Sequence, residues 1–222
     1  MTQPAAVPAA RDTRVSTAPG LFLCFEGGDG AGKSTQVRLL TDVLEARGRD
    51  VVVTRQPGGT ALGSQVRDLV LHGEHVAPRA EALLFAADKA HHVEELIAPA
   101  LAAGKVVITD RYTDSSIAYQ GAGRDLGADE IRELQHWAVG GLFPDLTVVL
   151  DVTPAVGRQR RGDVHDRLES EGDGFHAAVR QGFLDLAARE PDRYVVIDAA
   201  LPAATIHATV LARLDAVLGD RG

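Results

Sequence analysis

Five short runs of apolar residues, separated by helical patterns, constrain the fold of this 222-residue chain more than any other feature. Between the runs, apolar residues recur every three or four positions, which is typical of helices. Runs that are apolar on both faces are typical of central strands in a parallel sheet covered by helices on both sides. We therefore predict a doubly wound α/β fold of about five parallel strands. The runs lie at 21–25, 51–53, 106–108, 146–150 and 195–197, and the helical patterns at 37–44, 79–103 and 206–218.

Composition further limits the domain organisation, the partners and the compartment. Residues 1–19 are rich in Ala, Pro and Thr without periodicity, so we predict a disordered tail followed by one domain over 20–222. The formal net charge of -8 argues against a nucleic-acid partner, because binding to a phosphate backbone requires a basic surface. The single cysteine, Cys24, cannot form an internal disulfide, and no apolar run approaches the roughly 18–20 residues of a membrane span. We expect a cytoplasmic protein with no membrane contact.

A glycine-rich motif follows the first apolar run. Residues 27–34 fit the pattern G-x-x-x-x-G-K-[ST], between a predicted strand and a predicted helix. Glycines let backbone N–H groups turn toward phosphate oxygens, and the helix adds its positive N-terminal end. Lys33 is expected to reach the β- and γ-phosphates, and Ser34 to ligate Mg²⁺. The pattern predicts a P-loop that binds ATP through Gly27, Gly28, Asp29, Gly30, Ala31, Gly32, Lys33, Ser34 and Thr35.

The class of P-loop protein follows from what the chain lacks and what it adds. Because the sequence contains no Asn, it cannot supply the Asn-Lys-x-Asp motif of a small GTPase. The length suits a small kinase that acts on nucleotides. Such an enzyme needs a second anion site, and two candidates follow predicted strands: T-R-Q-P-G-G-T at 54–60 and D-R-Y at 110–112. There, Asp110 can hold Mg²⁺ through water, and Arg111 can bridge the donor and acceptor phosphates.

Longer motifs resemble those of the bacterial thymidylate kinases, in the same order, from about residue 21 to residue 218. The resemblance implies a P-loop kinase fold, the reaction ATP + dTMP → ADP + dTDP, and a homodimer. The motifs are the P-loop, TRQPGGT (54–60), LLFAADKAHHV (83–93), DRYTDSSIAYQG (110–121), PDLTVVLDVTP (144–154) and DRLE (166–169).

The resemblance also implies a binding site for the thymine base. Phe85 is the residue that would stack on the base, and Gln120 would pair with its edge. Ser116 would be a polar neighbour in the same pocket. Most relatives have an arginine where this chain has Lys89, which keeps the charge but loses the planar fork of donors.

Further roles follow from the same resemblance. Tyr119 would crowd the sugar 2′ position and favour deoxyribose, and Asp29 would lie near the acceptor sugar and the metal. Arg55 and Arg67 would be basic residues of the acceptor site. Pro57 and Ser115 complete the implied substrate-binding set.

The segment 158–167, R-Q-R-R-G-D-V-H-D-R, resembles the arginine-bearing lid of the family. Some relatives carry an arginine where this chain has Gly30, so the guanidinium that stabilises the transition state is expected from the lid. Arg160, Arg161 and Arg167 are the catalytic candidates, together with Lys33 and Arg111. Either Arg158 or Arg160 could pack beside the adenine; a solvated arginine-rich loop is the alternative.

Several other residues carry weaker signals. Gln56 replaces a glutamate of the relatives and is expected in the pocket without a catalytic role. Histidines 72, 75, 91 and 92 are expected on the surface or in the core, not at a zinc ion, because four ligands at recognisable spacing are missing. Trp137 is expected in the core or, alternatively, at the dimer contact. The Lys33 side chain is expected to face solvent without ligand.

Two other functions stay open at this point. A kinase of UMP, CMP or GMP would have the same architecture and a different base pocket. A P-loop module that binds ATP without transferring phosphate would tolerate the loss of Arg111.

Overall fold

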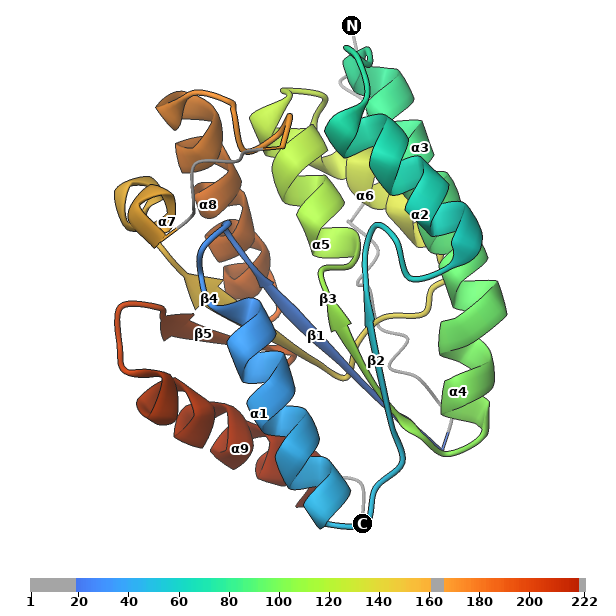
Figure 1. Cartoon of the computed structure of the whole chain (residues 1–222), viewed down its shortest axis with the longest axis vertical. Helices are drawn as coiled ribbons and strands as arrows, with labels where there is room; N and C mark the ends of the chain where they lie inside the picture. The colour runs from blue at the N-terminus through green and yellow to red at the C-terminus, as the bar shows by residue number, and fades with distance from the viewer. Residues whose placement is uncertain (1–18, 161–165, 220–222) are drawn as a thin grey trace, which may run out of the picture.

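The computed structural model describes residues 19–160 and 166–219, which form a parallel five-stranded sheet with helices on both faces (Figure 1). The strand order is β2-β3-β1-β4-β5, so β1 lies at the centre and each neighbouring pair is parallel. The predicted fold class is confirmed. The strands are β1 (Leu21–Gly27), β2 (Val51–Arg55), β3 (Val106–Asp110), β4 (Leu146–Asp151) and β5 (Tyr194–Asp198).

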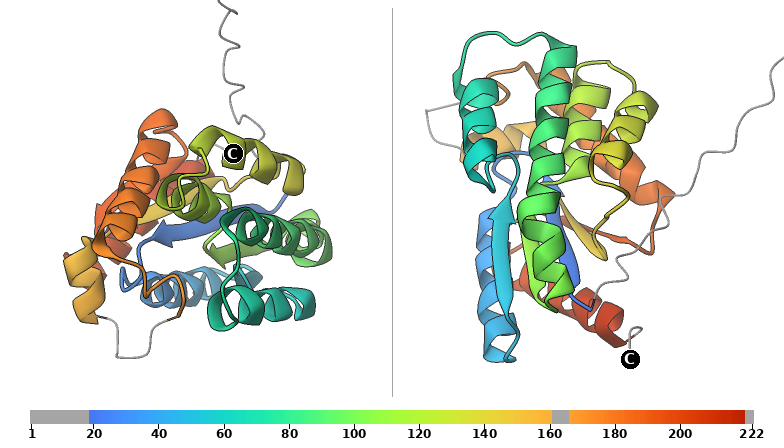
Figure 2. Two further views of the ribbon diagram at one scale, coloured as in Figure 1. Left: turned by 90° about the horizontal axis from the view of Figure 1, so that it is seen from above. Right: turned by 90° about the vertical axis from the view of Figure 1, so that its right-hand side faces the viewer.

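The helices form two layers, and the view from above in Figure 2 shows the sheet between them. One layer contains α1 (Lys33–Ala46) and α9 (Ala203–Gly219). The other includes α4 (Ala98–Ala102), α5 (Thr113–Ser116) and α8 (Asp173–Arg189). The remaining helical elements are α2 (Ala61–Arg67), η1 (Asp68–His72), α3 (Pro78–His92), η2 (Val93–Ile97), η3 (Ile117–Gly123), α6 (Ala128–Ala138) and α7 (Pro154–Arg160).

Alternation along β1 divides the core between these layers. Leu21, Leu23 and Phe25 pack in the cluster with the buried residues of α1 and α9. Phe22 and Cys24 point the other way and pack near Ile97 and Tyr112. Every residue of β1 is buried, so the strand has no solvent-facing side, as its continuous apolar run predicted.

Glycines end the first two predicted helices. Gly48 and Gly104 adopt φ values of 74° and 76°, a left-handed conformation that glycine accepts without a steric penalty. The long pattern at 79–103 becomes a continuous run of α3, η2 and α4, which confirms a helical stretch there.

Three further expectations concern the N-terminal tail, the lid segment and Trp137. The disordered tail at 1–19 lies outside the described residues except for its last position. The segment 158–167 does not begin as a loop, because Arg158 and Arg160 belong to the last turn of α7. Trp137 is not in the core: its side chain is 80% exposed on α6.

Candidate active site

The P-loop connects the central strand β1 to α1. Its turn requires backbone conformations that favour glycine: φ is 127° at Gly27 and 77° at Gly30. A Cβ atom on Gly27 would lie 2.3 Å from the carbonyl oxygen of Leu150, and one on Gly30 would lie 2.5 Å from that of Gly157. An arginine at position 30 therefore cannot occupy this backbone without a shift of α7. The packing explains why this chain has a glycine there.

Lys33 is folded back into the loop that it follows. Its Nζ donates to the carbonyl oxygens of Gly27 and Gly28, at 3.2 and 3.1 Å. The side chain is only 8% exposed, and burial lowers the pKa of Lys33. The expectation of a solvent-facing lysine is wrong, because the carbonyl oxygens of the loop accept hydrogen bonds from the ammonium and hold it inside.

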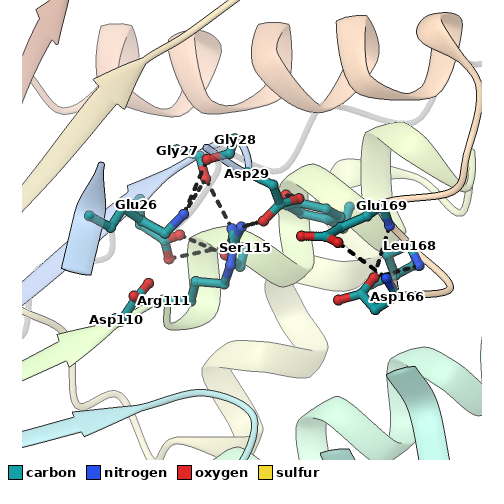
Figure 3. A network of polar contacts seen from close by, with 12 residues as sticks. Glu26, Gly27, Gly28, Asp29, Asp110, Arg111, Ser115, Asp166, Leu168 and Glu169 are labelled. Carbon is teal, nitrogen blue, oxygen red and sulfur yellow. Dashed lines mark hydrogen bonds and ion pairs between the residues drawn. The ribbon is translucent and has the colours of Figure 1, made fainter. Parts of the chain in front are cut away.

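Arg111 directly follows β3, and its side chain contacts the P-loop (Figure 3). One guanidinium nitrogen donates to the Gly27 carbonyl oxygen at 3.0 Å and to Ser115 Oγ at 3.1 Å, and the other forms an ion pair with Asp29. Burial alone would raise the pKa of the Asp29 carboxyl, but Arg111 and Lys33 hold it well below its usual range. The Tyr119 hydroxyl also donates to Asp29, at 3.0 Å.

Glu26, which sequence reasoning missed, accepts hydrogen bonds from the segment that contains Arg111 and Ser115. The Ser115 hydroxyl donates to Glu26 Oε2 at 2.6 Å, and the backbone N–H of Tyr112 donates to Oε1 at 2.7 Å. Burial raises the pKa of Glu26 to about 7, with Asp114 adding to the effect and Arg111 opposing it. A charged residue at the end of a fully buried strand was the signal available in the sequence.

The predicted metal residues lie side by side at the mouth of the P-loop. Ser34 Oγ is 3.5 Å from a carboxylate oxygen of Asp110, and both residues line the same cavity. A hydroxyl and a carboxylate are oxygen donors of the kind that Mg²⁺ prefers. The residues present therefore fit this ion.

A cavity of about 130 Å³ opens beside Arg111. Of the eleven predicted substrate-binding residues, it contains all except Arg55, which is exposed and lines the P-loop cavity instead. The cavity is lined by Asp29, Gln56, Pro57, Arg67, Leu71, Phe85, Lys89, Arg111, Tyr112, Ser115, Ser116, Tyr119, Gln120, Asp166, Leu168 and Glu169.

The P-loop cavity and this second cavity meet. Both are lined by Asp29, Gln56, Arg67, Arg111 and Glu169, so these residues stand where a group bound on one side would face a group bound on the other. Glu169 is the last residue of the DRLE motif, and the sequence alone predicts no role for its carboxylate. Figure 3 labels it together with Asp29, which lines the same two cavities.

The inner end of the second cavity is formed by α3 and the turn that begins at α5. Lys89 is buried, donates to Ser116 Oγ at 2.8 Å, and lies 5.4 Å from the centre of the Phe85 ring. Burial lowers the pKa of Lys89 to about 8. An aromatic face and a cluster of hydrogen-bonding groups at one end suit a planar polar ring.

Gln56 is anchored by His92 beneath the T-R-Q-P-G-G-T segment. Gln56 Nε2 lies 2.8 Å from His92 Nδ1, and Thr54 Oγ1 lies 2.8 Å from His92 Nε2. Burial lowers the pKa of His92 to about 4, with Lys89 contributing, so the ring is neutral near pH 7. His72 and His75 are exposed.

Of the three lid arginines within the described residues, only Arg160 lines the P-loop cavity. Arg160 lines it while donating to the Ala199 carbonyl oxygen at 2.8 Å. Arg158 pairs with Asp173, and Arg167 pairs with Glu81 and donates to the Val70 carbonyl oxygen. Arg161 lies outside the described residues.

Comparisons with known proteins agree with this geometry. The family model described as thymidylate kinase matches residues 25–210. The chain belongs to the thymidylate kinase family. It is 57% identical over 203 residues to the thymidylate kinase of Clavibacter michiganensis subsp. michiganensis (strain NCPPB 382), covering 90% of this chain and 96% of that one.

Two further members of the thymidylate kinase family support the same assignment. The thymidylate kinase of Bifidobacterium longum (strain NCC 2705) is 57% identical over 196 residues, covering 86% of this chain and 95% of that one. The crystal structure of thymidylate kinase from Ehrlichia chaffeensis superposes with a TM-score of 0.73 at 34% identity, covering 88% of this chain and 98% of that one. The resemblance inferred from motifs is confirmed over most of the chain.

Proposed function

We propose that this chain transfers the γ-phosphoryl group of ATP to dTMP, giving ADP and dTDP, with the roles of individual residues as follows. The observation that carries the proposal is the meeting of two cavities at Arg111, one built on the P-loop and one closed by Phe85, Lys89 and Gln120. Membership of the thymidylate kinase family supports the same reaction.

ATP binds at the P-loop. The backbone N–H groups of residues 27–34 surround the phosphates, and the N-terminus of α1 adds its partial positive charge. The Lys33 ammonium leaves the Gly27 and Gly28 carbonyls and pairs with the β- and γ-phosphates. The pair Ser34 and Asp110 would hold Mg²⁺, which when bound neutralises charge on the triphosphate.

dTMP binds in the second cavity with its base between Phe85 and Gln120 and its phosphate toward Arg111. A nucleoside monophosphate is largely dianionic at neutral pH, so its phosphate oxygen attacks without a general base. Arg111 lies between the donor and acceptor phosphates and aligns them. Arg160, which lines the P-loop cavity, stabilises charge on the transferring group, and closure over the site excludes water.

A coupled assay of ADP release tests the proposal. We expect turnover with dTMP and much weaker turnover with UMP, CMP and GMP. A kinase of another monophosphate would show its preference in this panel. A protein that only binds ATP would release no acceptor-dependent ADP, and Arg111→Ala would change nothing; either result would overturn the proposal.

Association into a homodimer belongs to the same proposal. Leu83 on α3 and Trp137 on α6 are 59% and 80% exposed, on two helices that contact each other. Large exposed apolar side chains are common at protein interfaces. Trp137→Glu should shift the sedimentation coefficient toward the monomer if this face is the contact, and a monomeric wild type would exclude the dimer.

The compartment is also a prediction. None of the helices in the described part of the chain is long and apolar enough to cross a membrane. The free thiol of Cys24 is buried in β1. A reducing compartment that supplies ATP, the cytoplasm, would suit both the thiol and the reaction.

A further inference from the structure

Glu81 is a buried carboxylate that the proposed reaction does not use directly. It lies on α3 with no exposed surface. Gln120 Nε2 donates to Glu81 Oε1 at 2.9 Å. The guanidinium of Arg167 pairs with Oε2, and Arg124 Nε and Nη2 lie 3.4 and 3.5 Å from the two carboxylate oxygens. One carboxylate thus joins α3, η3 and the C-terminal end of the lid segment 158–167.

This carboxylate decides which end of the Gln120 side chain is available to a ligand. A carboxylate held by two guanidinium groups can only accept hydrogen bonds, so the amide end that faces it must be the NH₂ end. The Gln120 nitrogen is thereby committed to Glu81. Because Gln120 also lines the second cavity, its carbonyl oxygen is the polar end left for the ligand.

We infer that Glu81 is a specificity-determining positioning residue, which makes Gln120 an acceptor and so selects a pyrimidine that carries a proton on N3. The inference rests on the proposed function. Thymine offers an N3–H donor flanked by carbonyl oxygens. Cytosine instead has an unprotonated N3 and an amino group on C4. A Gln120 oxygen and the Lys89 ammonium, from two residues that line the same cavity, match the thymine pattern and oppose the cytosine pattern.

The variant Glu81→Gln reverses this arrangement with little change in shape. The oxygen of the new amide is favoured at the Oε2 position, where Arg124 and Arg167 both donate. Its NH₂ group then faces Gln120, which satisfies it by turning its own oxygen toward position 81. The Gln120 nitrogen would enter the cavity as a donor, which suits the N3 of cytosine and not the N3–H of thymine.

The decisive measurement is the ratio of kcat/KM for dTMP to that for dCMP, repeated as a ratio of Kd values by calorimetry. We expect Glu81→Gln to lower this ratio by roughly tenfold or more. The loosening of Arg167 affects both acceptors and cancels in the ratio. Glu81→Asp keeps the acceptor and should keep the preference. Glu171→Gln, which alters the 2.5 Å contact with Arg124 without touching Gln120, is a matched control and should also leave the ratio unchanged.

A double-mutant cycle with Gln120→Leu isolates the cause. If Glu81 acts through the Gln120 amide, Glu81→Gln should no longer change the ratio in the Gln120→Leu background. An unchanged ratio in folded Glu81→Gln, or the same change without Gln120, would overturn the inference. A wild type that binds dTMP but transfers no phosphate would instead overturn the proposed function, and the Kd ratio would still test the inference.

A second measurement applies if Glu81→Gln does not fold. In the wild type, the side-chain NH₂ protons of Gln120 should be protected from solvent exchange both with and without dTMP, because the nitrogen stays on Glu81. Loss of that protection, or its appearance only with dTMP, would show that the ligand and not Glu81 orients the amide, and the inference would fail.

Discussion

The two halves of the active site are built in different ways. On the ATP side, the P-loop is shaped by glycine backbone, and its one long side chain, Lys33, bonds to main-chain carbonyls. On the acceptor side, the cavity wall is a network of buried side chains, in which Glu26 supports Ser115 and Glu81 supports Gln120. A backbone site can be recognised from a short motif, whereas a side-chain network depends on partners distant in sequence.

The largest effect should come from the backbone half. Lys33→Ala removes the only ammonium of the P-loop, and we expect kcat to fall by roughly 10²–10³-fold or more, because a preorganised charge on the phosphates is lost. The Gly27 carbonyl oxygen keeps Arg111 as a donor, so the melting temperature should change little. ADP release and calorimetry measure the two effects.

Arg38→Ala, on the exposed face of α1, is the matched control and should behave as wild type. Wild-type turnover in a folded Lys33→Ala protein would contradict the P-loop assignment.

On the acceptor side, Tyr119 tests whether a buried side chain sets the preference for deoxyribose. Its ring is held by Phe175 and Phe183, with centroids 6.0 and 6.3 Å away, and its hydroxyl donates to Asp29. If the ring crowds the sugar 2′ position, Tyr119→Ala should lower the preference for dTMP over its ribose analogue by roughly tenfold to 10²-fold. The ratio of kcat/KM values for the two acceptors measures it.

Tyr119→Phe is the companion variant. It keeps the ring and should keep the preference, while the KM for dTMP rises a few-fold because Asp29 loses one donor. A preference unchanged in Tyr119→Ala would place the ring outside the sugar pocket.

The same contrast explains what could be predicted from the sequence. The sheet and the P-loop followed from local patterns, since apolar runs and a spaced Gly-Lys-Ser motif carry their meaning within a few residues. The base pocket came from resemblance, because Phe85 on a helix is indistinguishable from an ordinary core aromatic. Glu81 could not be found at all: a glutamate in a helical pattern predicts a solvated face, and its partners are 39 to 86 residues away.

The wrong expectations have physical causes as well. For Trp137, the core and the dimer contact are the two expectations from the sequence; the core is wrong because α6 presents the side chain outward, and the dimer contact stays a prediction. Lys33 is expected to face solvent as a predicted phosphate ligand, but its buried ammonium needs acceptors and donates to the nearest carbonyl oxygens.

A smaller effect is expected at Lys89, where most relatives have an arginine: the KM for dTMP should depend on pH. Because burial lowers the pKa of Lys89 to about 8, its charge is present below that pH and is lost as the pH rises through it. We expect the KM for dTMP to rise a few-fold between pH 7 and pH 9.5. Lys89→Arg should abolish the rise, since a guanidinium stays charged.

The same exchange at Lys105, which precedes β3, is the control and should leave the pH profile as in the wild type. A flat profile in the wild type would mean that the charge of Lys89 takes no part in binding the base.

The smallest expected effect concerns Gln56 and its neutral partner His92, where this chain departs from the glutamate of most relatives. Gln56→Glu places a carboxylate on a ring whose pKa burial lowers to about 4, and an adjacent negative charge favours the protonated ring. We expect the His92 pKa to rise by about 1–3 units in NMR titrations, since an opposite charge at contact distance shifts a pKa by that amount. The change in kcat/KM should be only a few-fold, because most relatives carry a glutamate at this position. Gln65→Glu, on the exposed face of α2, is the matched control and should leave the His92 pKa unmoved. An unchanged pKa in Gln56→Glu would mean that the new carboxylate turns away toward Arg55 or Arg67, and the two halves of the site would then be linked by charge at this position.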